Sequence, residues 1–149
     1  MKKNLNSFII IFLSLGLIVI GFKYIESQSA RKELQSTIDN SFRQQLGSVL
    51  GSFSMEVNDY TYRSMISTVS NVSAMSELTS YGRINDNLDI SLNYLYISLR
   101  EEKSKDLVLL RADQLREIFH LLVQDPSSQE ATDKIIEITK EVFFENTQE

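Results

Sequence analysis

The feature that most constrains this chain is an apolar run near its N-terminus. From Leu5 to Ile25, 15 of 21 residues are apolar, and no charge occurs from Phe8 to Phe22. A helix rises about 1.5 Å per residue, so a run of this length can cross a hydrocarbon layer about 30 Å thick. Lys23 and Tyr24 stand where a cationic side chain and an aromatic ring are favoured at a membrane interface. The sequence therefore predicts a short cytoplasmic tail and a transmembrane anchor within residues 1–25.

Two other interpretations of this run stay open. A cleaved signal peptide also has a basic start and an apolar core, although residues 27–29 form a poor cleavage site far from that core. A buried helix of a soluble protein is the other interpretation. Basic residues flank the run on both sides, at residues 2–3 and 23–32, so the positive-inside rule is nearly balanced. The short tail and the long C-terminal domain favour a body on the extracytoplasmic side of the cell membrane.

The composition excludes several classes of function. The chain has no Cys and one His, which excludes disulfide scaffolds, thiolate metal sites and His clusters. Without residues 1–23 there are 12 basic and 20 acidic side chains, a net charge of −8, which argues against nucleic-acid binding. The sequence has no glycine-rich phosphate loop, and His120 stands alone on an expected helix. We therefore expect no enzyme activity, no catalytic or metal-binding residue and no cofactor.

A long stalk helix, continuous with the anchor, is expected over residues 26–80. No proline interrupts this stretch, and apolar residues recur in steps of 4, 4, 3, 4, 4 and 3, at Ile38, Phe42, Leu46, Val49, Phe53, Val57 and Tyr60. A period near 3.67 residues gives a nearly straight or slightly right-handed stripe. Leu50 makes the stripe wider than the seam of a strict two-stranded coiled coil. This favours packing on later helices of the same chain, and dimerisation through the stalk stays open.

Within the stalk, residues 64–79 place a serine at every third position and an apolar residue in the third place of each of the five triplets. A step of three residues turns a helix by about 300°, so each stripe slips by about 60° per triplet and moves around most of the helix. This pattern predicts contacts on several sides, in one of two settings. The helix is either a moderately buried member of the bundle or a surface that docks a partner helix through Ser64, Ser67, Ser70, Ser73, Ser76, Ile66, Val69, Val72 and Met75.

Residues 83–149 are expected to form a helical hairpin, or two to three helices, packed on the stalk. Gly82 marks the end of the preceding helix, and leucines from Leu88 to Leu99 follow a helical spacing. Asp125-Pro126 ends a further helix, and residues 127–130 match a capping box that begins the last one. The predicted fold is all-α, with an N-terminal transmembrane helix that continues into the stalk of a bundle.

The function predicted from these features is that of a single-pass membrane-anchored protein–protein interaction module, an accessory or assembly subunit of a cell-envelope complex. Its partners are the lipid bilayer, through Leu5 to Ile25, and other membrane or envelope proteins, with homo-oligomerisation left open. The alternative is an extracytoplasmic sensory domain that binds a ligand in a cavity near Tyr60, Tyr94 and Tyr96. Such a domain would signal through a membrane partner, because the six residues before Ser7 leave no room for an output domain.

Overall fold

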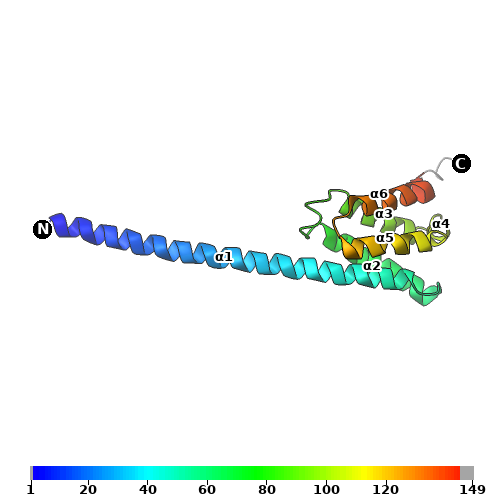
Figure 1. Ribbon diagram of the computed structural model, residues 1–149, viewed down its shortest axis with the longest axis horizontal. Helices are drawn as coiled ribbons and strands as arrows, with labels where there is room; N and C mark the ends of the chain where they lie inside the picture. Colours follow the sequence, from blue (N-terminus) through cyan, green and yellow to red (C-terminus); the bar gives the residue numbers. More distant parts are fainter. Residues whose placement is uncertain (1, 145–149) are drawn as a thin grey trace. The chain divides into compact units, whose positions relative to one another are not determined.

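Every regular element in the described part of the chain is a helix, which confirms the all-α prediction (Figure 1). The computed structural model describes the backbone of residues 2–144 and the side chains of residues 12–13 and 15–143. The elements in order are α1 (Lys2–Phe53), α2 (Asp59–Ser76), α3 (Leu88–Arg100), α4 (Lys105–Leu109), α5 (Ala112–Gln124), α6 (Gln129–Thr139) and the π-helical turn η1 (Lys140–Phe144).

The chain divides into two compact units, the N-terminal unit (Met1–Thr37) and the body (Ile38–Glu149). Helix α1 supplies the first unit and also enters the second. Within the residues that the structure describes, no helix is both long enough and apolar enough to cross a membrane. The apolar run from Leu5 to Ile25 begins at residues 5–11, whose side chains lie outside that description.

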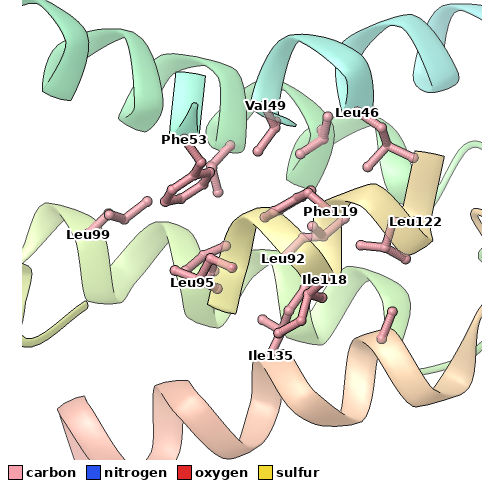
Figure 2. Close-up of a cluster of buried hydrophobic side chains, with 14 of the residues drawn as sticks. Leu46, Val49, Phe53, Leu92, Leu95, Leu99, Ile118, Phe119, Leu122 and Ile135 are labelled. Carbon is pink, nitrogen blue, oxygen red and sulfur yellow. The ribbon is translucent and has the colours of Figure 1, made fainter. Parts of the chain in front are cut away.

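The body is a helical bundle around one apolar core, as predicted, but in the described part of the chain four α-helices follow residue 83 where a hairpin or two to three helices were expected. The predicted stripe of α1 enters this core at Phe42, Leu46, Val49 and Phe53, which are all at most 3% exposed. Figure 2 shows how side chains of α1, α3, α5 and α6 gather in one cluster. The ring of Phe53 stacks on that of Phe119 with centroids 5.6 Å apart. From Phe42 to Phe53, the periodic apolar residues of the stripe are thus buried.

The helix expected over residues 26–80 is divided into two, because α1 ends at Phe53 and α2 begins at Asp59. The side chain of Asn58 accepts hydrogen bonds from the backbone N–H groups of Tyr60 and Thr61, each at 3.0 Å. Thr61 Oγ1 in turn accepts a bond from the Asn58 N–H at 2.8 Å, which completes a capping box. This local cap starts a new helix and leaves Val57 and Tyr60, the last members of the stripe, 46% and 81% exposed.

The connection between α2 and α3 is fastened to α1. Asp39 accepts two hydrogen bonds from Ser80, one from its backbone N–H at 2.8 Å and one from its hydroxyl at 2.6 Å. Arg43 Nε donates to the Tyr81 hydroxyl at 2.7 Å. At Gly82 a Cβ would lie 2.6 Å from the Ser76 carbonyl oxygen, and the φ angle of this glycine is not positive. Glycine is therefore needed here for close approach to the end of α2.

The same connection is also fastened to the turn between α5 and α6 by Asn85, which is 1% exposed. Its Nδ2 atom lies 3.3 Å from Ser127 O, 3.2 Å from Ser128 O and 3.1 Å from Thr132 Oγ1. Its Oδ1 atom accepts a bond from the Asn87 N–H at 3.1 Å. One buried amide therefore joins two loops that are more than 40 residues apart in the sequence.

The expected ends of α5 and α6 are present, with a shift of one residue at the cap. Helix α5 ends at Gln124, directly before Asp125-Pro126, as predicted. The cap of α6 is Ser128, whose hydroxyl accepts a bond from the Ala131 N–H at 3.3 Å. Ser127 instead donates to Asp125 through both its N–H and its hydroxyl. These two bonds hold the pKa of the Asp125 carboxyl below its usual value.

Candidate functional site

The nine residues predicted to dock a partner lie on α2 with very different exposure. Val69, Val72 and Ser76 are buried in the body, where α2 packs against α3. Ser67 is exposed, and the remaining five are half-buried, namely Ser64, Ile66, Ser70, Ser73 and Met75. The core of the body therefore already buries Val69 and Val72, the central apolar residues of the serine triplets on α2. The outer face of α2 carries Arg63, Ser67, Asn71 and Ala74.

The three tyrosines predicted to surround a ligand cavity differ in exposure and lie on two helices. Tyr60 is 81% exposed, whereas Tyr94 and Tyr96 are half-buried on α3. A fourth tyrosine, Tyr62 on α2, donates its hydroxyl hydrogen to the Leu99 carbonyl. Burial raises the pKa of Tyr62 above its ordinary value, and the nearby Lys105 ammonium partly opposes this shift. Tyr62 thus secures α2 to the end of α3.

The body presents a groove of about 880 Å³ between the last turns of α1, helix α5 and the segment formed by α6 and η1. Its apolar residues are Leu50, Ile118, Leu121 and Ile138, and its remaining lining residues are Ser54, Arg111, Gln114, Arg116, Glu117, His120, Lys134, Glu137 and Glu141. Ile118 and Ile138 are 4% and 7% exposed, so they form the base. The charged residues other than Arg111 and Glu141 are exposed, so they form the rim.

The three cations that line the groove are each already paired with a carboxylate. Arg111 Nη2 contacts Glu141 Oε2 at 2.6 Å and connects the start of α5 to η1. Arg116 pairs with Asp113 at 3.1 Å, and Lys134 pairs with Glu130 at 2.6 Å. The hydrogen bond from Lys134 holds the pKa of the Glu130 carboxyl below its usual value.

Two carboxylates of the rim, in contrast, take part in none of these ion pairs. Among the side chains that the structure describes, Glu117 and Glu137 form no ion pair, although both are exposed on the groove lining. The lining has three cations and three carboxylates, but two of the cations pair with Asp113 and Glu130 outside it, which leaves Glu117 and Glu137 without an ion pair among the described side chains above an apolar base. His120 also lines it and lies 3.0 Å from the side-chain nitrogen of Gln124. In the described part of the chain, no three His, Asp or Glu side chains gather in a way that could hold a metal ion.

The second candidate surface is the apolar part of α1 in the N-terminal unit. Ten large apolar side chains between Phe12 and Ile25 are 54–76% exposed. Exposed apolar surface of this extent is unusual on a protein surface and typically marks contact with a membrane or another protein.

The groove was not predicted from the sequence, because its lining comes from three separate helices. The pairs Asp113–Arg116 and Glu130–Lys134 each lie within one helix at a spacing that the sequence shows, whereas the pair Arg111–Glu141 depends on how the start of α5 meets η1. Comparison with protein-family models, curated proteins and solved structures finds no match to this chain. The fold and the two surfaces thus define an all-α protein with an apolar N-terminal helix and an acidic grooved body.

Proposed function

We propose that this chain is a single-pass membrane-anchored module that acts by binding other proteins, as an accessory or assembly subunit of a cell-envelope complex. The observation that carries the anchor is the exposure of α1 between Phe12 and Ile25. Leu17 to Ile20 are consecutive, so their side chains point around most of the helix circumference. A helix that is apolar on all sides is stable in a protein core or in lipid.

The energy of covering this surface supports the proposal. Burial of a large apolar side chain contributes roughly 1.5–3 kcal/mol relative to exposure in water. Ten such side chains together therefore favour an apolar environment by more than about 10 kcal/mol. A bilayer supplies that environment on every side of the helix.

Among the described side chains, two polar contacts lie at the end of the apolar run. Lys23 Nζ pairs with Glu26 Oε2 at 2.7 Å, and Gln28 Nε2 donates to the Tyr24 hydroxyl at 3.1 Å. Cationic and aromatic side chains of this kind are favoured at the membrane–water interface. They support an end of the span near Tyr24, and we place the body on the extracytoplasmic side as part of the proposal.

The support for a binding role is the groove of the body, since its apolar base opens to solvent between charged residues. Concave surfaces with an apolar base and a few polar groups are preferred binding sites. The partners would be other membrane or envelope proteins, held near the body by the common membrane.

The anchor is tested by flotation of the full-length protein with phosphatidylcholine–phosphatidylglycerol vesicles, followed by alkaline extraction. We expect the unchanged chain to stay with the vesicles after extraction. The double substitution Leu17→Lys and Ile20→Lys should release it, since each charge at the centre of a span costs about 2.5–3.5 kcal/mol.

The control is Leu110→Lys, which places the same charge on a body residue that is 81% exposed. This variant should float like the unchanged protein. An unchanged chain that stays at the bottom of the gradient, or is removed by alkaline extraction, contradicts the anchor. Protease protection in sealed spheroplasts tests the orientation, because digestion of the body from outside is expected and protection of the body would reverse the assignment.

A further inference from the structure

We propose that the groove between α1, α5 and α6 binds a basic amphipathic helix of a partner protein. This proposal deepens the proposed function and rests on one part of it, namely that the body acts by binding other proteins. It names the surface and the chemistry of the partner.

The shape of the groove suits a helix. Its lining on α5 extends from Arg111 at the start of the helix to Leu121 near its end. Ten residues of helix span about 15 Å, which is close to three turns of a docked helix. Leu50, Leu121 and the two buried isoleucines at the base would contact apolar side chains at spacings of three, four and seven residues.

The charge of the groove decides which kind of helix it takes. The cations Arg111, Arg116 and Lys134 are each paired with a carboxylate of the chain itself, and Glu117 and Glu137 have no such pair within the described residues. A partner with Lys or Arg beside its apolar stripe would neutralise these two carboxylates. Charge complementarity of this kind accelerates association and selects against acidic partners.

The same charges argue against the chain's own C-terminal end as the occupant. Residues 145–149 contain Glu145 and Glu149 and no basic residue, so they would meet a rim of the same sign. The body as a whole is acidic, which disfavours binding of one body to another through this rim. A separate basic helix is the occupant that the charges favour.

The test uses the full-length protein in a non-ionic maltoside detergent and two matched peptide probes. Both are 18-residue helices with leucines at positions i, i+3, i+4 and i+7, flanked by lysines in one peptide and by glutamates in the other. Fluorescence anisotropy measures binding, with empty micelles as the blank. We expect the lysine peptide to bind at least tenfold more tightly than the glutamate peptide.

The decisive variant is Glu117→Lys with Glu137→Lys, which should weaken binding of the lysine peptide at least tenfold and favour the glutamate peptide. Its matched control, Glu77→Lys with Asp86→Lys, changes the net charge equally at exposed positions outside the groove lining. The control should change either affinity less than twofold. Equal effects of the two pairs, or no binding of either peptide, would overturn the proposal. Far-UV circular dichroism verifies that both variants remain folded.

Location is tested by disulfide trapping, because the chain contains no cysteine. A cysteine-bearing lysine peptide should crosslink to Gln114→Cys in the groove at least fivefold faster than to Ser67→Cys on the outer face of α2. Equal rates, or a Gln114→Cys protein that crosslinks to itself in preference to the peptide, would refute the assignment of the groove to a partner helix. These measurements are made in detergent micelles, so they can succeed where flotation fails and fail where flotation succeeds.

Discussion

The side chain of Asn85 is predicted to be among the most sensitive positions of the body. Substitution to Ala removes the donors that face Ser127 O, Ser128 O and Thr132 Oγ1, and the acceptor of the Asn87 N–H. An amide NH₂ has two hydrogens, so about three hydrogen bonds are lost in total. At about 1 kcal/mol each, Asn85→Ala should lower the free energy of unfolding by about 3 kcal/mol.

Asn85→Asp keeps the shape and removes the donors, which makes it the sharper variant. Its carboxylate would face the two carbonyl oxygens of residues 127 and 128, so at pH 7 it should be less stable than Asn85→Ala. The folded state favours the protonated acid, which raises the pKa of this carboxyl above the unfolded value of about 3.9. The deficit of Asn85→Asp is therefore smallest below about pH 4 and grows as the pH rises through the folded-state pKa.

Urea unfolding of the full-length protein in maltoside detergent, followed by far-UV circular dichroism between pH 3.5 and 7.5, measures both effects. Asn71→Ala and Asn71→Asp serve as matched controls, because Asn71 is exposed on α2. They should change the stability by less than about 0.5 kcal/mol. The reasoning is refuted if Asn85→Ala falls within the range of these controls, or if Asn85→Asp follows Asn85→Ala at every pH.

Three further predictions concern single contacts and use the same unfolding assay. Gly82→Ala should destabilise the body by about 1–3 kcal/mol, because its Cβ would lie 2.6 Å from a backbone oxygen. Gly51→Ala, whose Cβ would have nothing within 4 Å, should instead stabilise α1 by up to about 1 kcal/mol. A change of the same sign in both variants would contradict the close approach at Gly82. Asn58→Ala should cost about 1 kcal/mol through the lost cap of α2, and Asn58→Asp should restore most of it. The pair Arg111–Glu141, whose side chains are 40% and 43% exposed, should show a coupling below about 1 kcal/mol in a double-mutant cycle, decreasing in 0.5 M salt; a coupling that salt leaves unchanged would mean that the pair is less solvated than its exposure indicates.

The parts of the fold that the sequence predicts well are those set by local periodicity. The stripe from Phe42 to Phe53 is buried, because apolar residues spaced three and four apart share one face of a helix. The break after Phe53 was missed, since Val57 and Tyr60 continue the same spacing into the turn. The capping box that starts with Asn58 is a local signal for this break, but an uninterrupted stripe conceals it.

The parts that the sequence does not predict depend on contacts between distant segments. Residues 83–87 are polar and typical of a turn, and the burial of Asn85 among them results from the approach of the α5–α6 turn. The groove depends on the same kind of contact, because Leu50 and Ile138 line one surface only when α1 and α6 both pack on the core. A sequence pattern contains the chemistry of such residues but not their proximity.

The burial and exposure of the serine-triplet residues follow from helix geometry once the direction of the core is known. Taking the centre of the core between Val69 and Val72, a slip of about 60° per triplet puts Ile66 and Met75 about 90° to either side, and both are half-buried. The same construction puts Ser76 within about 10° of the core direction and Ser67 almost opposite to it, in agreement with their burial and exposure. The outer face of α2 is therefore left with small and polar residues such as Ser67 and Ala74. A partner helix that docked there would bury little apolar surface, whereas the groove with Leu50 and Leu121 offers an apolar base; the binding role is therefore better supported at the groove than at the triplets.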